Sequence, residues 1–174
     1  MLVQHLERTR DAFVTASDGL SAAQYRFAPA SDGWSIAQIV EHVALAELRI
    51  LEVIGRLPQA PAPSDGKTRG AARFARLDTT VPTRDQRRIV APEPLVPRGT
   101  WASPATSLTA FVDARAQTIA AVAAVDADAL EHVLPHRFFG EFDLEEWAYF
   151  LALHSARHTA QVLELKGSAG FPTA

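Results

Sequence analysis

Four long stretches of the sequence carry the apolar spacing and the end signals of amphipathic helices. We find no convincing two-residue alternation of the kind that strands show, and no internal repeat. A helix with one apolar face must bury that face against other elements. Four helices of this length therefore predict one all-α domain over residues 1–174, a four-helix bundle. The predicted helices are 2–17, 35–56, 103–125 and 143–166.

Capping signals support the predicted boundaries. Ser35 and Ser103 are suitable N-caps, and Pro104 suits the first turn of the helix that follows Ser103. Asp143 has a glutamate three residues later, which resembles a capping box, and Gly167 suits the end of the last helix. The side chains of serine and aspartate at an N-cap accept hydrogen bonds from backbone N–H groups that a helix start leaves without a partner.

A long connection, residues 57–102, separates the second predicted helix from the third. It holds seven of the eleven prolines, and a connection of this length in a small domain is either functional or irregular. We expect a short helix near 68–78, an extended course for "PEPLVPRG", and a contribution of this connection to the wall of a pocket. Simple up-down bundles use short loops, so we do not expect the second and third helices to be hairpin neighbours.

The composition is that of an ordinary globular protein. Apolar residues make up 48% of the chain and charged residues 21%, and the net charge of −3 offers no basic surface for nucleic acid or an anionic membrane. The first residues are amphipathic rather than a signal sequence, and no run approaches ~18 apolar residues, so we expect a cytoplasmic protein. The sequence has no cysteine, which excludes disulfides, thiolate ligands and a cysteine nucleophile.

Two histidines, His154 and His158 in "HSARHTAQVLEL", lie four residues apart in the last predicted helix. Helical phase places them about 40° apart, within the apolar stripe that also carries Trp147 and Leu151. Both imidazoles should therefore point into the bundle, where their nitrogens need partners. Two interpretations stay open on this pattern: a core pair satisfied by carbonyls, water or other side chains, or half of a metal site.

A third histidine, His42 in "WSIAQIVEHVALAE", lies at the flank of the second predicted helix, about 80° from the centre of its apolar face. Such a position can reach a neighbouring helix, although a lone histidine at a helix edge is the more common case. Three neutral imidazoles that met at one point would suit Zn²⁺, Ni²⁺ or Fe²⁺ and would leave one or more coordination positions open to water.

The combination of "GWSIAQIVEHVALAE", "FVDAR" and "HSARHTAQVLEL" resembles the DinB/YfiT-like metalloprotein superfamily, in particular DinB-like domain type 2, over residues 15–166. The resemblance implies a four-helix bundle with a long link between its second and third helices. It also implies that His42, His154 and His158 bind one divalent transition metal. The implied activity is that of a hydrolase using metal-bound water, or of an S-transferase using a low-molecular-weight thiol such as bacillithiol or mycothiol.

Several functional questions stay open at this point. The alternative to an enzyme is a metal-stabilised binding or stress-response protein without turnover, and a homodimer is also open. We expect a small-molecule substrate or thiol cofactor as partner, and neither nucleic acid nor membrane. No catalytic residue is assigned, because Glu41 and Glu47 need not face the metal. Three basic residues of the long connection could bind an anionic substrate, although a solvated loop is the more common case: Arg84, Arg87 and Arg88.

Other polar and aromatic residues have weaker claims on the site. Gln161 could orient a histidine ligand, but a surface amide is an equal alternative. His132 and His136 also lie four apart, yet a proline between them argues against a shared helical face, so we expect them in a loop. We expect Trp34 and Trp147 to anchor the core.

Overall fold

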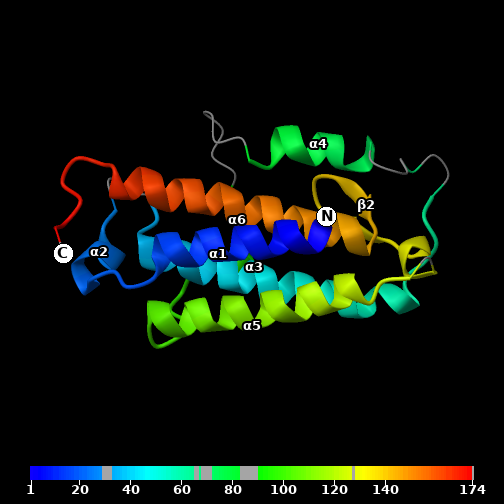
Figure 1. The fold of residues 1–174 in the computed structure, drawn as a ribbon, viewed down its shortest axis with the longest axis horizontal. Coiled ribbons are helices and arrows are strands. Elements are labelled where there is room, and N and C mark those ends of the chain that lie inside the picture. The colour runs from blue at the N-terminus through cyan, green and yellow to red at the C-terminus, as the bar shows by residue number, and fades with distance from the viewer. Residues whose placement is uncertain (29–32, 65–66, 68–71, 83–89, 127, 174) are drawn as a thin grey trace.

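In the computed structural model the chain forms a four-helix bundle (Figure 1). The long helices are α1 (Leu2–Ser17), α3 (Ile36–Arg56), α5 (Pro104–Ala123) and α6 (Leu144–Lys166), and each lies within two residues of its predicted bounds. None of the helices described is long and apolar enough to cross a membrane. The structure describes residues 1–28, 33–64, 67, 72–82, 90–126 and 128–173.

Side-chain caps begin three of the long helices at the predicted positions. The hydroxyls of Ser35 and Ser103 and the carboxylate of Asp143 each accept a hydrogen bond from the backbone N–H three residues on. The side chain of that third residue in turn bonds the N–H of the cap, so each start is a complete capping box. A further box at Ser21 begins the short helix α2 (Ala22–Arg26), which the sequence pattern did not predict.

Neighbouring helices in the bundle are parallel in two cases. Figure 1 shows α1 and α6 running in one direction side by side, and α3 and α5 running together in the opposite direction. A short loop could join only antiparallel neighbours. The long link is needed because it returns the chain along the bundle, so that α5 begins beside the start of α3. The two helices are therefore not hairpin neighbours, as expected.

Two apolar clusters fill the two ends of the bundle, and a buried polar layer separates them along every long helix. Arg115 of α5 and Glu47 of α3 form the centre of this layer, with exposed fractions of 0% and 1%. Trp147 belongs to the first cluster, which confirms it as a core residue. The ends of α1 and α6 and the starts of α3 and α5 form the second cluster, which includes Phe13, Ile39, Phe111 and Val162.

The link packs against the bundle. It opens with η1 (Leu57–Gln59) and contains α4 (Ala72–Thr80), the expected short helix, which lies along α6 and buries Leu77 completely (Figure 1). We expected an extended course for "PEPLVPRG", but part of this segment forms the 3₁₀ turn η2 (Glu93–Leu95). A proline near the start of η2 suits the first turn of a helix, where no intrahelical N–H is needed. The three arginines at 84, 87 and 88 lie outside the described residues.

The connection between α5 and α6 contains a small β-hairpin, which the sequence pattern did not predict. After the turn η3 (Asp128–Glu131), strand β1 (Leu134–His136) pairs antiparallel with β2 (Gly140–Phe142). Strands of three residues are too short for an alternating pattern to show in the sequence. Gly140, at the turn, has a φ of +79°, which glycine adopts without strain. His136 consequently lies in a strand, whereas His132 lies in the loop before it.

Candidate metal centre

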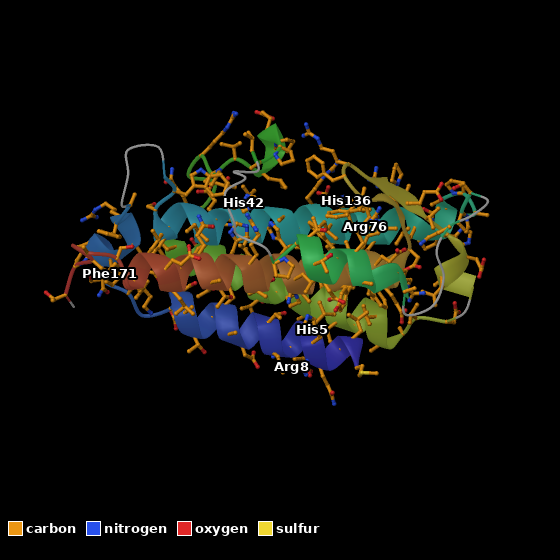
Figure 2. All side chains as sticks on the ribbon, turned by 90° about the horizontal axis from the view of Figure 1, so that it is seen from above. His5, Arg8, His42, Arg76, His136 and Phe171 are labelled. Carbon is orange, nitrogen blue, oxygen red and sulfur yellow. The ribbon has the colours of Figure 1, made fainter. Side chains whose placement is uncertain are left out.

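The structure brings the three predicted histidines together where α3 and α6 meet. Nε2 of His154 lies 3.3 Å from Nε2 of His42 and 3.2 Å from Nε2 of His158. One nitrogen from each ring lies within 4.8 Å of the other two, so the cluster could hold a metal ion. His42 and His158 are buried, while His154 is partly exposed. Figure 2 shows His42 on α3, next to the part of the link that contains η2.

Oxygen acceptors hold the other ring nitrogen of two of these histidines. Nδ1 of His42 lies 2.8 Å from the carbonyl oxygen of Leu95, and Nδ1 of His158 lies 2.8 Å from Oε1 of Gln161. Because a carbonyl or amide oxygen only accepts, each Nδ1 carries the hydrogen and each Nε2 presents a lone pair. Gln161 thus contacts a candidate ligand as an acceptor, and the link contributes to the surroundings of the cluster through Leu95.

The convergence of the three rings fits a metal better than it fits hydrogen bonding alone. A neutral His154 carries at most one hydrogen on Nε2, so it can donate to only one of the two lone pairs beside it. A tetrahedral metal about 2.0–2.1 Å from each nitrogen needs ligand nitrogens about 3.3 Å apart. The two Nε2–Nε2 distances of 3.3 and 3.2 Å match that spacing. A set of imidazole nitrogens suits zinc, nickel or ferrous iron rather than magnesium or calcium.

Burial favours the neutral form of His42 and His154, which is the form that binds metals. Desolvation lowers the pKa of His42 below its ordinary value of 6.5, and the hydrogen bond to the Leu95 carbonyl opposes this in part. Desolvation also lowers the pKa of His154 well below 6.5, and repulsion from the neighbouring His158 and His42 lowers that pKa further. Because ligation requires a ring nitrogen without a proton, the lowered pKa values favour metal binding near neutral pH.

Aromatic rings contact two of the three histidines. The ring centroid of Trp34 lies 4.7 Å from that of His42, at an angle of 49°. The ring of Phe150 stacks on His154 at 5.7 Å, four residues earlier on the same face of α6. Trp34 therefore packs on a candidate ligand and is only partly buried, rather than acting simply as a core anchor. The spacing of Phe150 and His154 is the one signal in the sequence that could have indicated this contact.

The structure does not bring His132 or His136 into the cluster. Nδ1 of His132 lies 2.7 Å from the Ala60 carbonyl oxygen. His136 packs among aromatic rings, and Figure 2 shows it near Arg76. Desolvation, with a further contribution from the positive charge of Arg76, lowers the pKa of His136 to about 4. Phe150 contacts both His136, at 4.7 Å between centroids, and His154, so one ring separates His136 from the cluster.

The two glutamates near His42 in the sequence are both engaged elsewhere. Glu47 forms a two-pronged ion pair with Arg115, at 2.7 Å from Nε to Oε1 and 2.9 Å from Nη2 to Oε2. Glu41 accepts hydrogen bonds from three consecutive backbone N–H groups of the link, at 2.8–3.1 Å. Burial alone would raise the pKa of Glu41, but these hydrogen bonds outweigh it and lower that pKa. Neither carboxylate is therefore free to act as a general base beside the histidines.

Known proteins share this architecture. A solved structure, YfiT from Bacillus subtilis, described as "a probable metal-dependent hydrolase with an unusual four-helix bundle topology", superposes with a TM-score of 0.68 at 17% identity, over 98% of this chain and 87% of YfiT. This likeness shows the fold. The uncharacterized protein YuaE of Bacillus subtilis (strain 168) is 26% identical over 149 residues, which are 85% of this chain and 86% of YuaE. A family model, the DinB superfamily, matches residues 5–162, and the chain therefore belongs to the DinB superfamily.

Proposed function

We propose that this protein is a metal-dependent enzyme in which His42, His154 and His158 bind one divalent transition metal. The observation that carries the proposal is the convergence of three Nε2 atoms, two of them on rings whose Nδ1–H groups are held by oxygen acceptors. Ligand histidines in metalloproteins are commonly oriented by such acceptors. The description of YfiT as a probable metal-dependent hydrolase supports the same class of function.

Turnover, rather than a purely structural metal, is supported by the number of protein ligands that the cluster offers. Structural metal sites are closed by four protein ligands, whereas catalytic sites keep a position open for water or substrate. Among the described residues, the cluster consists of three histidines. A metal bound by three histidines would keep a coordination position for water or a small-molecule substrate.

The residues around the cluster have separable roles in this proposal. When bound, the metal would act as a Lewis acid that makes water or a thiol a better nucleophile at neutral pH. The Leu95 carbonyl and the Gln161 amide oxygen hold two of the rings in the orientation that directs Nε2 to the shared point. Trp34 and Phe150 cover the flanks of His42 and His154 and limit the access of bulk water.

Hydrolysis is the first candidate reaction, and thiol transfer is the second. One observation favours the second: both Glu41 and Glu47 are committed to other partners and cannot take a proton from water. A thiol, with an ordinary pKa of about 8.5, needs less help than water to lose its proton. The small-molecule substrate would then be an electrophile, and a low-molecular-weight thiol would be the second substrate.

Elemental analysis of protein purified without a histidine tag tests the proposal. We expect about one equivalent of zinc, nickel or iron per chain, and its loss in the variants His154→Ala and His158→Ala. His132→Ala is the matched control, because His132 is held by a backbone carbonyl away from the cluster. Circular dichroism should show that all variants keep their helices. An unchanged metal content in both cluster variants would refute the assignment of these ligands.

Ester hydrolysis and thiol addition to an electrophile, measured on the metal-loaded protein, then separate the two reactions. Activity in either assay that disappears in His158→Ala and persists in His132→Ala supports an enzyme of that class. A metal-loaded protein that is inactive with broad panels of both substrate types favours the non-catalytic alternative.

A further inference from the structure

Glu41 directly precedes His42 on α3, and it is 7% exposed. Its Oε1 accepts hydrogen bonds from the backbone N–H groups of Arg98, at 3.0 Å, and Thr100, at 2.8 Å, and its Oε2 accepts from Gly99 at 3.1 Å. Successive N–H groups turned toward one anion form a backbone nest. Gly99 has a φ of +77°, in the left-handed region that glycine adopts without strain, and this conformation helps the turn to close around the carboxylate.

The segment that Glu41 holds also supplies the acceptor for His42. The carbonyl of Leu95, three residues before the nest, lies 2.8 Å from Nδ1 of His42. The intervening chain is short and stiff, because Leu95 ends the turn η2 and Pro97 restricts the backbone before the nest. Glu41 and His42, which are consecutive in α3, therefore both bind residues 95–100 of the link. Glu41 accepts hydrogen bonds from this stretch, and His42 donates one to it.

We infer that Glu41 is a positioning residue of the metal centre, which holds residues 98–100 so that the Leu95 carbonyl orients the ring of His42. This inference deepens the proposed metal function and rests on it. Without the carboxylate, three backbone N–H groups lose their acceptor, and the link can leave the position in which Leu95 meets His42. The ring of His42 then loses the contact that selects its Nδ1–H tautomer and its rotation.

Zinc binding to the full-length protein, measured by isothermal titration calorimetry with the metal alone, tests the first consequence. We expect Glu41→Gln to weaken zinc binding about 10- to 100-fold, the usual effect of removing an outer partner of a ligand. Glu93→Gln is the matched control. It removes an equal charge from the same segment, where Glu93 pairs at the surface with the side chain of Arg98, and it leaves in place the carboxylate that accepts from the backbone N–H groups of the nest. The control should bind zinc within about twofold of the wild type, because exposed ion pairs contribute little.

Nitrogen-15 NMR of the histidine rings in the metal-free protein tests the second consequence, independently of zinc. Wild type and Glu93→Gln should show His42 with its hydrogen on Nδ1, and Glu41→Gln should show a mixture of tautomers. If the wild type bound no zinc, the proposed metal function would fail, and the NMR comparison would still decide whether Glu41 orients His42. Unchanged His42 signals and unchanged zinc affinity in Glu41→Gln would overturn the inference.

A second variant covers the case in which Glu41→Gln does not fold. Glu41→Asp keeps the charge and shortens the side chain by one methylene group. It should retain part of the nest and give an intermediate zinc affinity with a partial tautomer mixture. Wild-type behaviour in both measurements for a folded Glu41→Asp protein, whose carboxylate is drawn back from the nest, counts against a positioning role.

Discussion

Replacing Arg115 by methionine should destabilise this protein far more than a surface substitution does. The Arg115 side chain is completely buried in the polar layer between the two apolar clusters, and it pairs with Glu47 through two hydrogen bonds. Its remaining N–H groups reach the two other long helices, so one side chain connects all four. The acceptors on those helices are Leu6 O and Thr9 Oγ1 of α1, and Leu151 O and Ser155 Oγ of α6.

The expected magnitude follows from the charge that the substitution leaves behind. In Arg115→Met, Glu47 stays buried at 1% exposure without its cation. Breaking a buried ion pair by removing one partner reduces the free energy of unfolding by about 3–5 kcal/mol. Each 1 kcal/mol shifts Tm by about 2–4 °C for a chain of 150–250 residues, so Tm should fall by roughly 6–20 °C. Removing both charges in Glu47→Leu/Arg115→Met is expected to recover at least ~2 kcal/mol of the loss.

Urea unfolding of the four members of this double-mutant cycle, followed by circular dichroism, measures the coupling. The metal-free protein should be used, because a bound metal would add its own stabilisation to every folded variant. A single substitution that costs less than ~1 kcal/mol, or a double variant whose loss equals the sum of the two single losses, would refute the reasoning. Such a result would mean that the ion pair contributes no specific stability to the bundle.

Three further predictions concern the site and its surroundings. Gln161→Leu removes the acceptor from His158, so zinc affinity measured by calorimetry should fall about 10- to 100-fold; an unchanged affinity would show that this hydrogen bond does not orient the ring. Burial lowers the pKa of His42 and His154, so zinc affinity should change little from about pH 7.5 to 6.5 and fall only at lower pH. A steep loss of affinity that begins above about pH 7 would contradict this prediction. NMR titration of His136 should give a pKa of about 4. Because this pKa lies below the 6.5 of an unfolded chain, the native state should lose stability as pH falls from 6.5 through about 4. A titration midpoint near 6.5 would exclude this burial.

The sequence by itself determined the long helices and the faces on which the fourth-helix histidines lie. Capping residues such as Ser35 and Asp143, and apolar spacing along each segment, act within one or two helical turns, so they can be recognised without knowing the fold. The same local rule placed His154 and His158 one turn apart on an inward face, as the structure shows. The hairpin was missed because three-residue strands are too short to give a local signal.

Only the tertiary structure decided which residues meet across the bundle. Helical phase left His42 at the flank of its helix, and its ring reaches His154 because α3 packs against α6. The acceptor for its Nδ1 comes from Leu95, 53 residues later in the chain, and the buried partner of Arg115 lies 68 residues before it. Contacts over such separations depend on the direction and packing of whole helices, which local propensity does not specify. The parallel arrangement of α3 and α5 (Figure 1) and the contact between the link and His42 are therefore decided only when the chain is folded.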